Sequence, residues 1–322
     1  MVAVVQTGYG SADVLELREC DKSEPGDGEV LVRVIAASIA AGDYFGMRGT
    51  PFPARLAIGF PKPRKDFIVG LDFAGVVESA GKGVTGFQPG DEVYGQCRGS
   101  CAEYAIAKPG AISLKPRNLT FEQAAGVPTS ACTALQGLRD RGKLMPGRKV
   151  LINGASGGVG PFAVQIAKAL GAEVTAVCST GNVEMAFSIG ADHVIDYTRE
   201  DFTRSGPRYD LIMDNVASHS LSDTRRALTP QGVHIPSSGN AGMGWIIVAA
   251  LTAIFVRQQG SPFVASTTGK DMVKLNEYIE AGKIVPVIDR TYALGNAPEA
   301  FRYLDEGHAR GKVVITMEHE SD

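Results

Sequence analysis

A glycine-rich segment is the clearest chemical motif in the sequence. The apolar run Lys149–Asn153 predicts a buried strand, and residues 154–160, GASGGVG, follow it directly. Ala155, Gly157 and Gly160 have the spacing of the dinucleotide-binding fingerprint G-x-G-x-x-G, with alanine in the first position. Glycines there permit a tight turn and a close approach to a pyrophosphate, while the N-terminus of the next helix attracts the anion. The alternative is a glycine-rich connector without a ligand. The residues predicted to contact the dinucleotide are Ala155, Ser156, Gly157, Gly158, Val159 and Gly160.

The end of the second predicted strand bears on the choice between NAD and NADP. NAD-specific proteins place a carboxylate about 20 residues beyond the fingerprint, where it binds the ribose 2′-hydroxyl. No Asp or Glu occurs between positions 174 and 183, where Ser179 and Thr180 stand instead. Their hydroxyls can donate to a 2′-phosphate, so we predict NADP(H). Tyr197 or Arg199, just beyond the third strand, either completes this contact or belongs to an ordinary surface pair.

Three parts of the sequence differ in how their apolar, Gly and Pro residues are spaced, and these patterns indicate the strands and helices that position the loop. Short β-like runs punctuated by Gly and Pro extend to about residue 120, and apolar runs alternate with helical periods over 121–260. Two helical stretches and a final strand over 311–317 follow. The pattern predicts an α/β fold with a doubly wound parallel sheet domain at 121–260. A small, mostly antiparallel β domain is expected from 1–120 together with 261–322, where the last strand returns to the first sheet.

The composition excludes several classes of protein. The chain has 322 residues, 44% of them hydrophobic, with 32 Lys+Arg against 35 Asp+Glu and a net charge of −3. This excludes disordered and fibrous classes, predicts about two domains, and gives no electrostatic reason to expect nucleic acid. The five cysteines are sparse and odd in number, so we expect no disulfide framework. The first residues lack the pattern of a signal peptide. We therefore expect a cytoplasmic protein.

The most apolar stretch is the uncharged run 243–256, which contains the single tryptophan, Trp245. It is shorter than the roughly 20 residues that span a bilayer, so we expect no integral membrane association. A helix in the core or at a subunit interface ranks above peripheral membrane attachment, because no basic amphipathic face accompanies it. Its apolar character also suggests a hydrophobic substrate.

Further motifs accompany the glycine loop. Residues 70–77 read GLDFAGVV, 80–81 AG, 88–93 QPGDEV and 311–314 GKVV. With these motifs the chain, from residue 1 to about 317, resembles the zinc-independent quinone oxidoreductase branch of the medium-chain dehydrogenase/reductase superfamily. The resemblance implies a GroES-like catalytic domain formed by both chain ends, a Rossmann NADP(H)-binding domain between them, a cofactor cleft at their junction, and a homo-oligomer.

The zinc ligands of the superfamily's alcohol dehydrogenases are missing from the matching stretches. Residues 36–43, AASIAAGD, and 70–72, GLD, contain neither Cys nor His, and no four-cysteine lobe is present. Cys97 and Cys101 form the only close cysteine pair and lack a nearby histidine. We therefore expect no metal site.

Tyr44 is the candidate catalytic residue. It matches the position at which many quinone oxidoreductases place a tyrosine near the nicotinamide. Its phenol can donate to the oxyanion that hydride transfer creates, stack on the substrate, or only pack within the small domain. Asp43 is a weaker candidate, because a carboxylate repels an oxyanion unless it is protonated.

The resemblance also implies further cofactor contacts beyond the glycine loop. Each has an ordinary alternative: a helix cap for the threonines, a polar turn for the serines and a solvated side chain for the lysine. The implied contacts are Thr129, Thr133, Asn215, Val216, Ser237, Ser238 and Lys312.

Together these features predict hydride transfer from NADPH to a small, hydrophobic quinone or α,β-unsaturated carbonyl, without zinc. Two other functions stay open at this point. One is a non-catalytic NADPH-binding sensor, and the other is a metal-dependent alcohol dehydrogenase.

Overall fold

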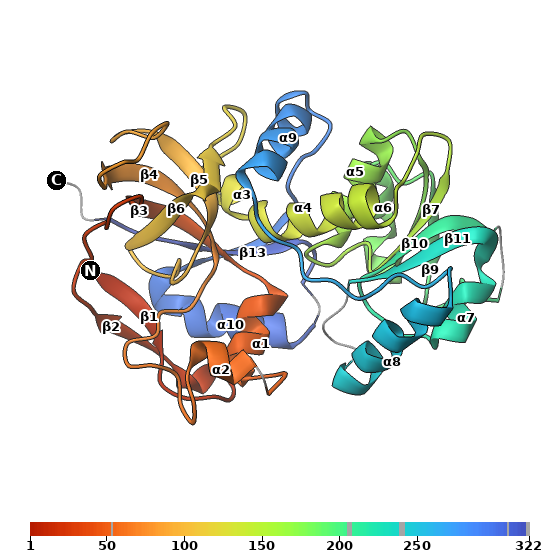
Figure 1. Ribbon diagram of the computed structural model, residues 1–322, viewed down its shortest axis with the longest axis horizontal. Helices are drawn as coiled ribbons and strands as arrows, with labels where there is room; N and C mark the ends of the chain where they lie inside the picture. The colour runs from red at the N-terminus through yellow and green to blue at the C-terminus, as the bar shows by residue number, and fades with distance from the viewer. Residues whose placement is uncertain (53, 205–207, 238–241, 308, 320–322) are drawn as a thin grey trace. The chain divides into compact units, whose positions relative to one another are not determined.

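The computed structural model describes residues 1–52, 54–204, 208–237, 242–307 and 309–319. These residues form two compact units (Figure 1). The β-rich unit comprises 1–129, 267–280 and the chain from 286 onward, and the parallel-sheet unit comprises 130–266 and 281–285.

The β-rich unit is built on a six-stranded sheet in the order β12-β13-β3-β4-β5-β6, with a further pairing of β3 to β6. Neighbouring strands are antiparallel except β12 and β13. The last strand, β13, pairs with β3, which confirms the predicted return of the chain end to the first sheet. The strands are β3 (Val30–Ile39), β4 (Asp72–Ala80), β5 (Glu92–Cys97), β6 (Tyr104–Leu114), β12 (Ile288–Ala293) and β13 (Lys312–Thr316).

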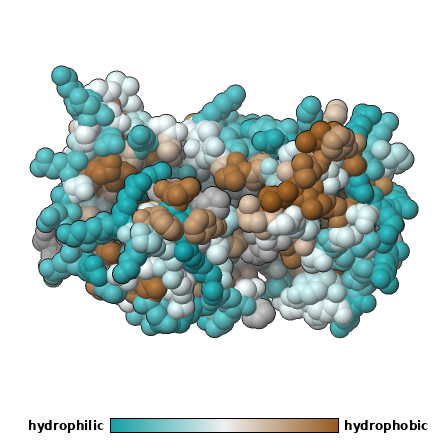
Figure 2. All heavy atoms as spheres, turned by 60° about the horizontal axis from the view of Figure 1, so that its bottom comes forward, coloured by the Kyte–Doolittle hydropathy of each residue, from teal (hydrophilic) through white to brown (hydrophobic). Residues whose placement is uncertain are grey.

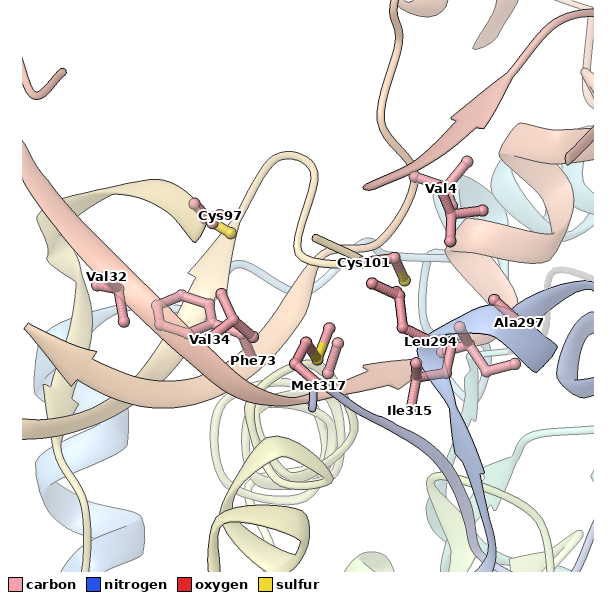
Figure 3. Close-up of a cluster of buried hydrophobic side chains, with 14 of the residues drawn as sticks. Val4, Val32, Val34, Phe73, Cys97, Cys101, Leu294, Ala297, Ile315 and Met317 are labelled. Atoms are coloured by element: carbon pink, nitrogen blue, oxygen red, sulfur yellow. The ribbon is translucent and has the colours of Figure 1, made fainter. Parts of the chain in front are cut away.

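The core of this unit follows from the alternation of side chains along the strands. Val32, Val34 and Phe73 project from β3 and β4 into one cluster with Ile315 of β13 (Figure 3). A two-stranded sheet of β1 (Val2–Gln6) and β2 (Leu15–Glu19) adds Val4 to the same cluster. The helices of the unit are α1 (Ala41–Arg48), α2 (Ala54–Ile58), α3 (Phe121–Ala125), α9 (Gly269–Glu280) and α10 (Ala297–Asp305), with 3-10 turns η1 (Ala12–Val14) and η4 (Leu294–Asn296).

The unit boundaries lie later in the chain than the predicted positions 120 and 260. Helix α3 packs against β3 and β4 and therefore belongs to the β-rich unit. The first change of unit falls within α4 (Pro128–Leu135), between 129 and 130, and the second falls between 266 and 267. The short segment 281–285 belongs to the parallel-sheet unit, where the Val285 N–H donates to the Gln165 side chain at 2.8 Å.

The parallel-sheet unit contains five parallel strands in the order β11-β10-β7-β8-β9. This confirms the predicted α/β fold, and it brings the carboxyl ends of all five strands to one edge. The strands are β7 (Lys149–Asn153), β8 (Glu173–Cys178), β9 (His193–Asp196), β10 (Tyr209–Asp214) and β11 (Leu228–Pro236). The helical segments are η2 (Gln136–Arg141), α5 (Gly160–Ala169), η3 (Thr180–Asn182), α6 (Val183–Ser188), α7 (Leu221–Arg226) and α8 (Gly242–Phe255).

Helix α8 covers the apolar run predicted to be a core or interface helix. Only Ala249 of this helix is buried, so the core interpretation is wrong within a single copy of the chain. An apolar patch is visible on the side of the molecule shown in Figure 2. The large apolar side chains of α8 that are 44% to 85% exposed are Met243, Ile247, Val248, Leu251, Ile254 and Phe255. No helix in the described ranges is long and apolar enough to cross a membrane.

Candidate active site

The glycine loop follows β7 at the carboxyl edge of the parallel sheet. Gly154 has a φ of 76°, a conformation that favours glycine. A Cβ on Gly160 would lie 2.2 Å from the Gly154 carbonyl oxygen, so the start of α5 closes against the loop only with glycine there. Gly157 is different, because the nearest heavy atom to a Cβ built on it is the Gly154 oxygen at 3.8 Å. Packing within the protein therefore does not require glycine at position 157.

The loop also presents unused hydrogen-bond donors. The Ala155 N–H donates to the Val177 carbonyl at 3.0 Å and the Gly157 N–H to the Gly154 carbonyl at 3.3 Å. Within the described parts of the chain, the N–H groups of Ser156, Gly158 and Val159 donate to no acceptor. Helix α5 starts directly afterwards without a side-chain cap. Free N–H groups at a helix N-terminus suit an anion, so the loop fits the pyrophosphate of a dinucleotide.

The ends of β8 and β9 bring together the residues predicted near the 2′-phosphate. Asn182 donates to the Ser179 hydroxyl at 3.0 Å, and the Tyr197 side chain is 62% exposed. The Thr180 hydroxyl donates to Asp196 at 2.6 Å, and Arg199 Nε lies 3.4 Å from the same carboxylate.

Asp196 is a residue that the sequence interpretation missed. Its hydrogen bonds from Thr180 and Thr198 lower the pKa of the carboxyl, so it is negatively charged at neutral pH. It comes from β9 and not from the segment after β8, so the absence of Asp and Glu from 174–183 does not exclude a carboxylate here. The signal available in the sequence is an acidic residue ending the third strand of the parallel sheet.

The carboxyl ends of β7, β10 and β11 hold another group of predicted contacts. Asn215 donates through its backbone N–H and its side-chain amide to the Asn153 carbonyl, each at 3.1 Å. The Ser237 hydroxyl donates to the Asn215 side chain at 2.5 Å. The Val216 N–H donates to the Asp214 carboxylate at 3.1 Å. The structure thus brings Asn215, Val216 and Ser237 together; Ser238 lies outside the described residues.

Thr129 belongs to a buried polar cluster in the β-rich unit. Its N–H donates to Asp72 Oδ2 at 3.1 Å, and its hydroxyl donates to Asp72 Oδ1 while accepting from Gln96 at 3.0 Å. The hydroxyl proton of Thr129 is therefore used within the protein. Thr133 lies one turn further along α4.

Asp43, Asp72 and Lys312 complete this cluster, and all three are buried. Lys312 is only 2% exposed, so the alternative of a solvated lysine is wrong. Burial lowers the pKa of Lys312 against the opposing charges of Asp72 and Asp43. Burial also raises the pKa of Asp72, although Lys312 and the bonds from Thr129 and Gln96 act against it. Burial, with a smaller contribution from the charge of Asp72, raises the pKa of Asp43 to about 7.

Tyr44 lies on helix α1, and its side chain reaches the last residue of α10. Its hydroxyl donates to Asp305 at 2.6 Å, and the Arg48 guanidinium pairs with the same carboxylate and lies 5.1 Å from the Tyr44 ring. Partial burial and the bond to Asp305 raise the pKa of the phenol. Its aromatic ring also packs against the core cluster of the β-rich unit. The Tyr44 hydroxyl must therefore break its hydrogen bond to Asp305 before it can donate to a substrate.

The stretches matched to the zinc-binding regions of the alcohol dehydrogenases offer a hydroxyl and carboxylates but neither Cys nor His. Ser38 is buried and its hydroxyl has no partner among the described residues, but a neutral hydroxyl is a poor ligand. Asp72 is already bonded to Thr129. Burial raises the pKa of both Cys97 and Cys101, which keeps these thiols protonated. Across the described ranges, no three His, Cys, Asp or Glu residues are grouped to hold a metal.

A β-rich domain joined to a parallel sheet with this glycine loop defines a dehydrogenase or reductase of the medium-chain class. Two family models match the chain: the alcohol dehydrogenase GroES-like domain over residues 26–136 and the zinc-binding dehydrogenase over 189–315.

Named relatives define the branch. The 2-methylene-furan-3-one reductase of Solanum lycopersicum is 34% identical over 98% of this chain and 79% of its own length. The chloroplastic NADPH-dependent alkenal/one oxidoreductase of Arabidopsis thaliana is also 34% identical over the same shares. A quinone oxidoreductase structure from Coxiella burnetii superposes with a TM-score of 0.89 at 28% identity, covering 99% of each chain. The chain belongs to the medium-chain dehydrogenase/reductase superfamily, in the quinone oxidoreductase and alkenal/one reductase branch. It is an NAD(P)H-dependent oxidoreductase of that type.

Proposed function

We propose that this protein transfers a hydride from NADPH to a small apolar α,β-unsaturated carbonyl or quinone, without a metal ion. The observation that carries the proposal is the glycine loop, whose N–H groups at Ser156, Gly158 and Val159 donate to no acceptor in the described structure. The bound nicotinamide supplies the hydride, and a proton from solvent completes the reduction of the acceptor. The relatives support this acceptor class, because they include a 2-methylene-furan-3-one reductase, an NADPH-dependent alkenal/one oxidoreductase and a quinone oxidoreductase.

The chain's own residues bind and orient the reactants. The loop and the N-terminus of α5 hold the pyrophosphate, and Asn215, Val216 and Ser237 lie on the ribose and nicotinamide side. Independence from metal is supported by Ser38, whose neutral hydroxyl is a poor zinc ligand, and by Asp72, whose carboxylate is already hydrogen-bonded to Thr129. The cytoplasm stays our proposed compartment on the basis of the free cysteines, although the Arabidopsis relative is chloroplastic.

The preference for NADPH over NADH rests on Thr180, Tyr197 and Arg199. Arg199 supplies a positive charge and Tyr197 a hydroxyl donor for a 2′-phosphate, whereas the Thr180 hydroxyl must leave the Asp196 carboxylate to donate there. The carboxylate of Asp196 opposes this preference, because it would lie on the same edge of the sheet and repel the phosphate. The pairing of Arg199 with Asp196 reduces that repulsion without removing it.

Self-association through α8 is also part of the proposal. The helix carries no Lys, Arg, Asp or Glu, so its exposed stripe matches neither a charged partner nor anionic lipid headgroups. A second copy related by a two-fold axis offers the same apolar stripe and can cover it. Leu251→Lys should shift the protein toward monomer in sedimentation velocity, while Val273→Lys, at an exposed apolar position of α9, should not. An unchanged oligomer in Leu251→Lys would remove α8 from the interface.

The assay that tests the activity follows NADPH and, separately, NADH absorbance on mixing with a quinone and an alkenal, before and after exhaustive chelation. We expect loss of NADPH faster than NADH, unaffected by the chelator. Tight NADPH binding without turnover on any acceptor would indicate the sensor function instead. Activity abolished by the chelator and restored by zinc would indicate the metal-dependent dehydrogenase.

Tyr44 has its own test within this assay. Tyr44→Phe removes only the hydroxyl, so if that group donates to the oxyanion, kcat should fall about 10- to 1000-fold. Asp305→Asn keeps the Tyr44 hydroxyl and weakens its competing bond, so it should retain kcat. Equal kcat in Tyr44→Phe and the unmodified protein would assign Tyr44 to packing alone.

A further inference from the structure

Asp214 and His234 form a buried polar pair in the parallel-sheet unit. The pair lies at the carboxyl edge of the sheet, where the glycine loop also lies. Asp214 is the last residue of β10 and is 1% exposed, and His234 lies on the neighbouring strand β11 and is 0% exposed. His234 Nε2 lies 3.3 Å from Asp214 Oδ2. Neither residue belongs to the contacts predicted from the sequence.

The hydrogen-bond partners of His234 fix the orientation of its ring. Its Nδ1 lies 3.1 Å from Gln259 Oε1, and Gln259 Nε2 donates to the Gly260 carbonyl at 2.9 Å, which leaves Oε1 facing the ring. Each ring nitrogen therefore faces an oxygen that can only accept. Because the Asp214 carboxylate oxygen can only accept, Nε2 carries the hydrogen in this contact, and the ring is held between Asp214 and Gln259.

The other carboxylate oxygen of Asp214 organises the loop that follows β10. Asp214 Oδ1 accepts the N–H groups of Val216 at 3.1 Å and Ala217 at 2.8 Å, and the side-chain amide of Asn153 at 2.8 Å. Ala217 has a φ of 59°, a left-handed conformation that is unfavourable for alanine without compensating bonds. One carboxylate thus joins the ends of β7 and β10 to a strained turn.

The Asp214 carboxyl group is ionised at neutral pH, which strengthens the hydrogen bonds that it accepts from the turn. Burial alone would raise the pKa of Asp214, but the hydrogen bond and charge of His234, with the N–H donors of Ala217 and Val216, bring it below its ordinary value. An ionised carboxylate accepts stronger hydrogen bonds than a neutral carboxyl. The turn is therefore held by charge-assisted bonds at neutral pH.

We infer that Asp214 and His234 are positioning residues: this hydrogen-bonded pair fixes the 215–217 turn in the conformation that receives the cofactor. The inference rests on the proposed NADPH site, because Asn215 and Val216 are its proposed contacts. Both residues are buried within the parallel-sheet unit, so the KM for the acceptor should stay unchanged. Loss of the pair should appear as weaker cofactor binding and a more mobile turn.

The test compares two carboxylates at opposite ends of β10. Asp214→Ala removes the acceptor of the turn, and Asp214→Asn keeps an acceptor oxygen but removes the charge. Asp210→Ala is the matched control, because Asp210 accepts the Lys149 N–H at 3.0 Å at the amino end of the same strand. We measure NADPH dissociation constants by fluorescence, the KM for an alkenal, and amide hydrogen exchange at Val216 and Ala217 in the protein without cofactor.

We expect Asp214→Ala to weaken NADPH binding by at least about tenfold and to speed exchange at both amides, with the KM for the alkenal unchanged. Asp214→Asn should recover part of the loss, and Asp210→Ala should change neither quantity. Unchanged NADPH affinity and exchange in Asp214→Ala, or an equal loss in Asp210→Ala, would overturn the inference. If the unmodified protein binds neither NADPH nor NADH, the proposed function fails, while the exchange measurement still decides whether Asp214 holds the turn.

His234→Gln supplies a second, independent readout. Glutamine can still donate to Asp214, so NADPH affinity should fall less than in Asp214→Ala. The Trp245 ring lies 6.3 Å from the His234 ring, edge to face, and is the only tryptophan in the chain. A histidine ring beside an indole quenches its fluorescence, so His234→Gln should brighten Trp245. Equal brightness of the variant and the unmodified protein would show that the His234 ring does not lie against Trp245, and unchanged NADPH affinity would show that His234 does not support Asp214.

Discussion

Asp214 in the parallel-sheet unit and Asp43 in the β-rich unit are both buried, yet their carboxyl pKa values shift in opposite directions. Asp214 faces His234, two backbone N–H groups and the Asn153 amide, and its pKa lies below the ordinary value. Asp43 accepts the Ala40 N–H at 2.8 Å, faces the carboxylate of Asp72, and has a pKa of about 7. Burial is common to both, so the donors and charges around each carboxyl decide whether it stays ionised.

The number of partners available to each carboxyl differs in the same direction. Asp214 has His234 as a hydrogen-bond partner of its own, whereas Asp43 and Asp72 share the single ammonium of Lys312. The β-rich cluster therefore reduces its excess charge by keeping a proton near neutral pH. A protonated Asp43 also no longer repels an oxyanion, which was the objection to a role in catalysis.

Removing the shared cation should have the largest effect. Lys312→Met leaves two buried carboxyls without a counter-charge and should lower the free energy of unfolding by about 3–5 kcal/mol in urea titrations. The double variant with Asp72→Asn should regain part of that loss. A loss below about 1 kcal/mol in Lys312→Met would show that the lysine does not balance this cluster.

The proton on Asp43 predicts a pH dependence of stability. The folded state keeps this proton up to about pH 7, whereas the unfolded chain releases it near pH 4, so stability falls as pH rises between these values. Asp43→Asn retains the acceptor for Ala40 but does not titrate. The loss of stability between pH 5 and pH 8 should therefore be smaller in the variant, by about 2–4 kcal/mol, when urea unfolding is measured at both pH values.

Asp27→Asn, at an exposed position, is the control for this measurement. It should leave the pH dependence as it is in the unmodified protein. A slope in Asp43→Asn equal to that of the unmodified protein would show that Asp43 is ionised in the folded state.

A smaller effect is expected from the bond that links Thr129 to the cluster. Thr129→Val keeps the shape of the side chain but removes the hydroxyl that Asp72 accepts, which should cost about 1.5–3 kcal/mol of unfolding free energy. Thr129→Ser keeps the hydroxyl and should cost much less. Equal stability of the two variants in urea would contradict a role for this hydrogen bond.

The smallest effect concerns a half-buried carboxylate, Asp196, which completes the comparison with the fully buried ones. Asp196→Asn removes a negative charge beside the proposed 2′-phosphate site and should strengthen NADPH binding by roughly two- to fivefold, with little change for NADH. Fluorescence titration with both cofactors measures the ratio. Weaker NADPH binding in the variant would show that Asp196 supports the site instead of opposing it.

The features that could be predicted from the sequence are those encoded by residues close together in the chain. The strand, glycine loop and helix over residues 149–169 are contiguous, so spacing alone indicates the loop, and the alternation of strands and helices indicates the parallel sheet. The return of the final strand to the first sheet was also predictable, through the resemblance in its GKVV motif. The predicted boundary at 120 was early because α3 packs on a sheet formed by distant strands.

The rest depends on contacts between residues far apart in the chain. Asp43, Asp72, Thr129 and Lys312 meet only after folding, so the sequence gives no sign that Lys312 is buried or that Asp43 keeps a proton. Asp196 reaches Thr180 from the next strand, and His234 reaches Asp214 across twenty residues. None of these pairs has a spacing that a motif records.

Binding of NADPH to three forms of the protein tests the central claim most directly. A Cβ at position 157 has open space within the protein, so Gly157→Ala and Gly157→Asp should both fold, as thermal unfolding can verify. If the loop holds the pyrophosphate, Gly157→Asp places a negative charge against it and should weaken NADPH binding by more than about tenfold beyond the effect of Gly157→Ala. Equal NADPH affinity of a folded Gly157→Asp variant and the unmodified protein would contradict the proposed site.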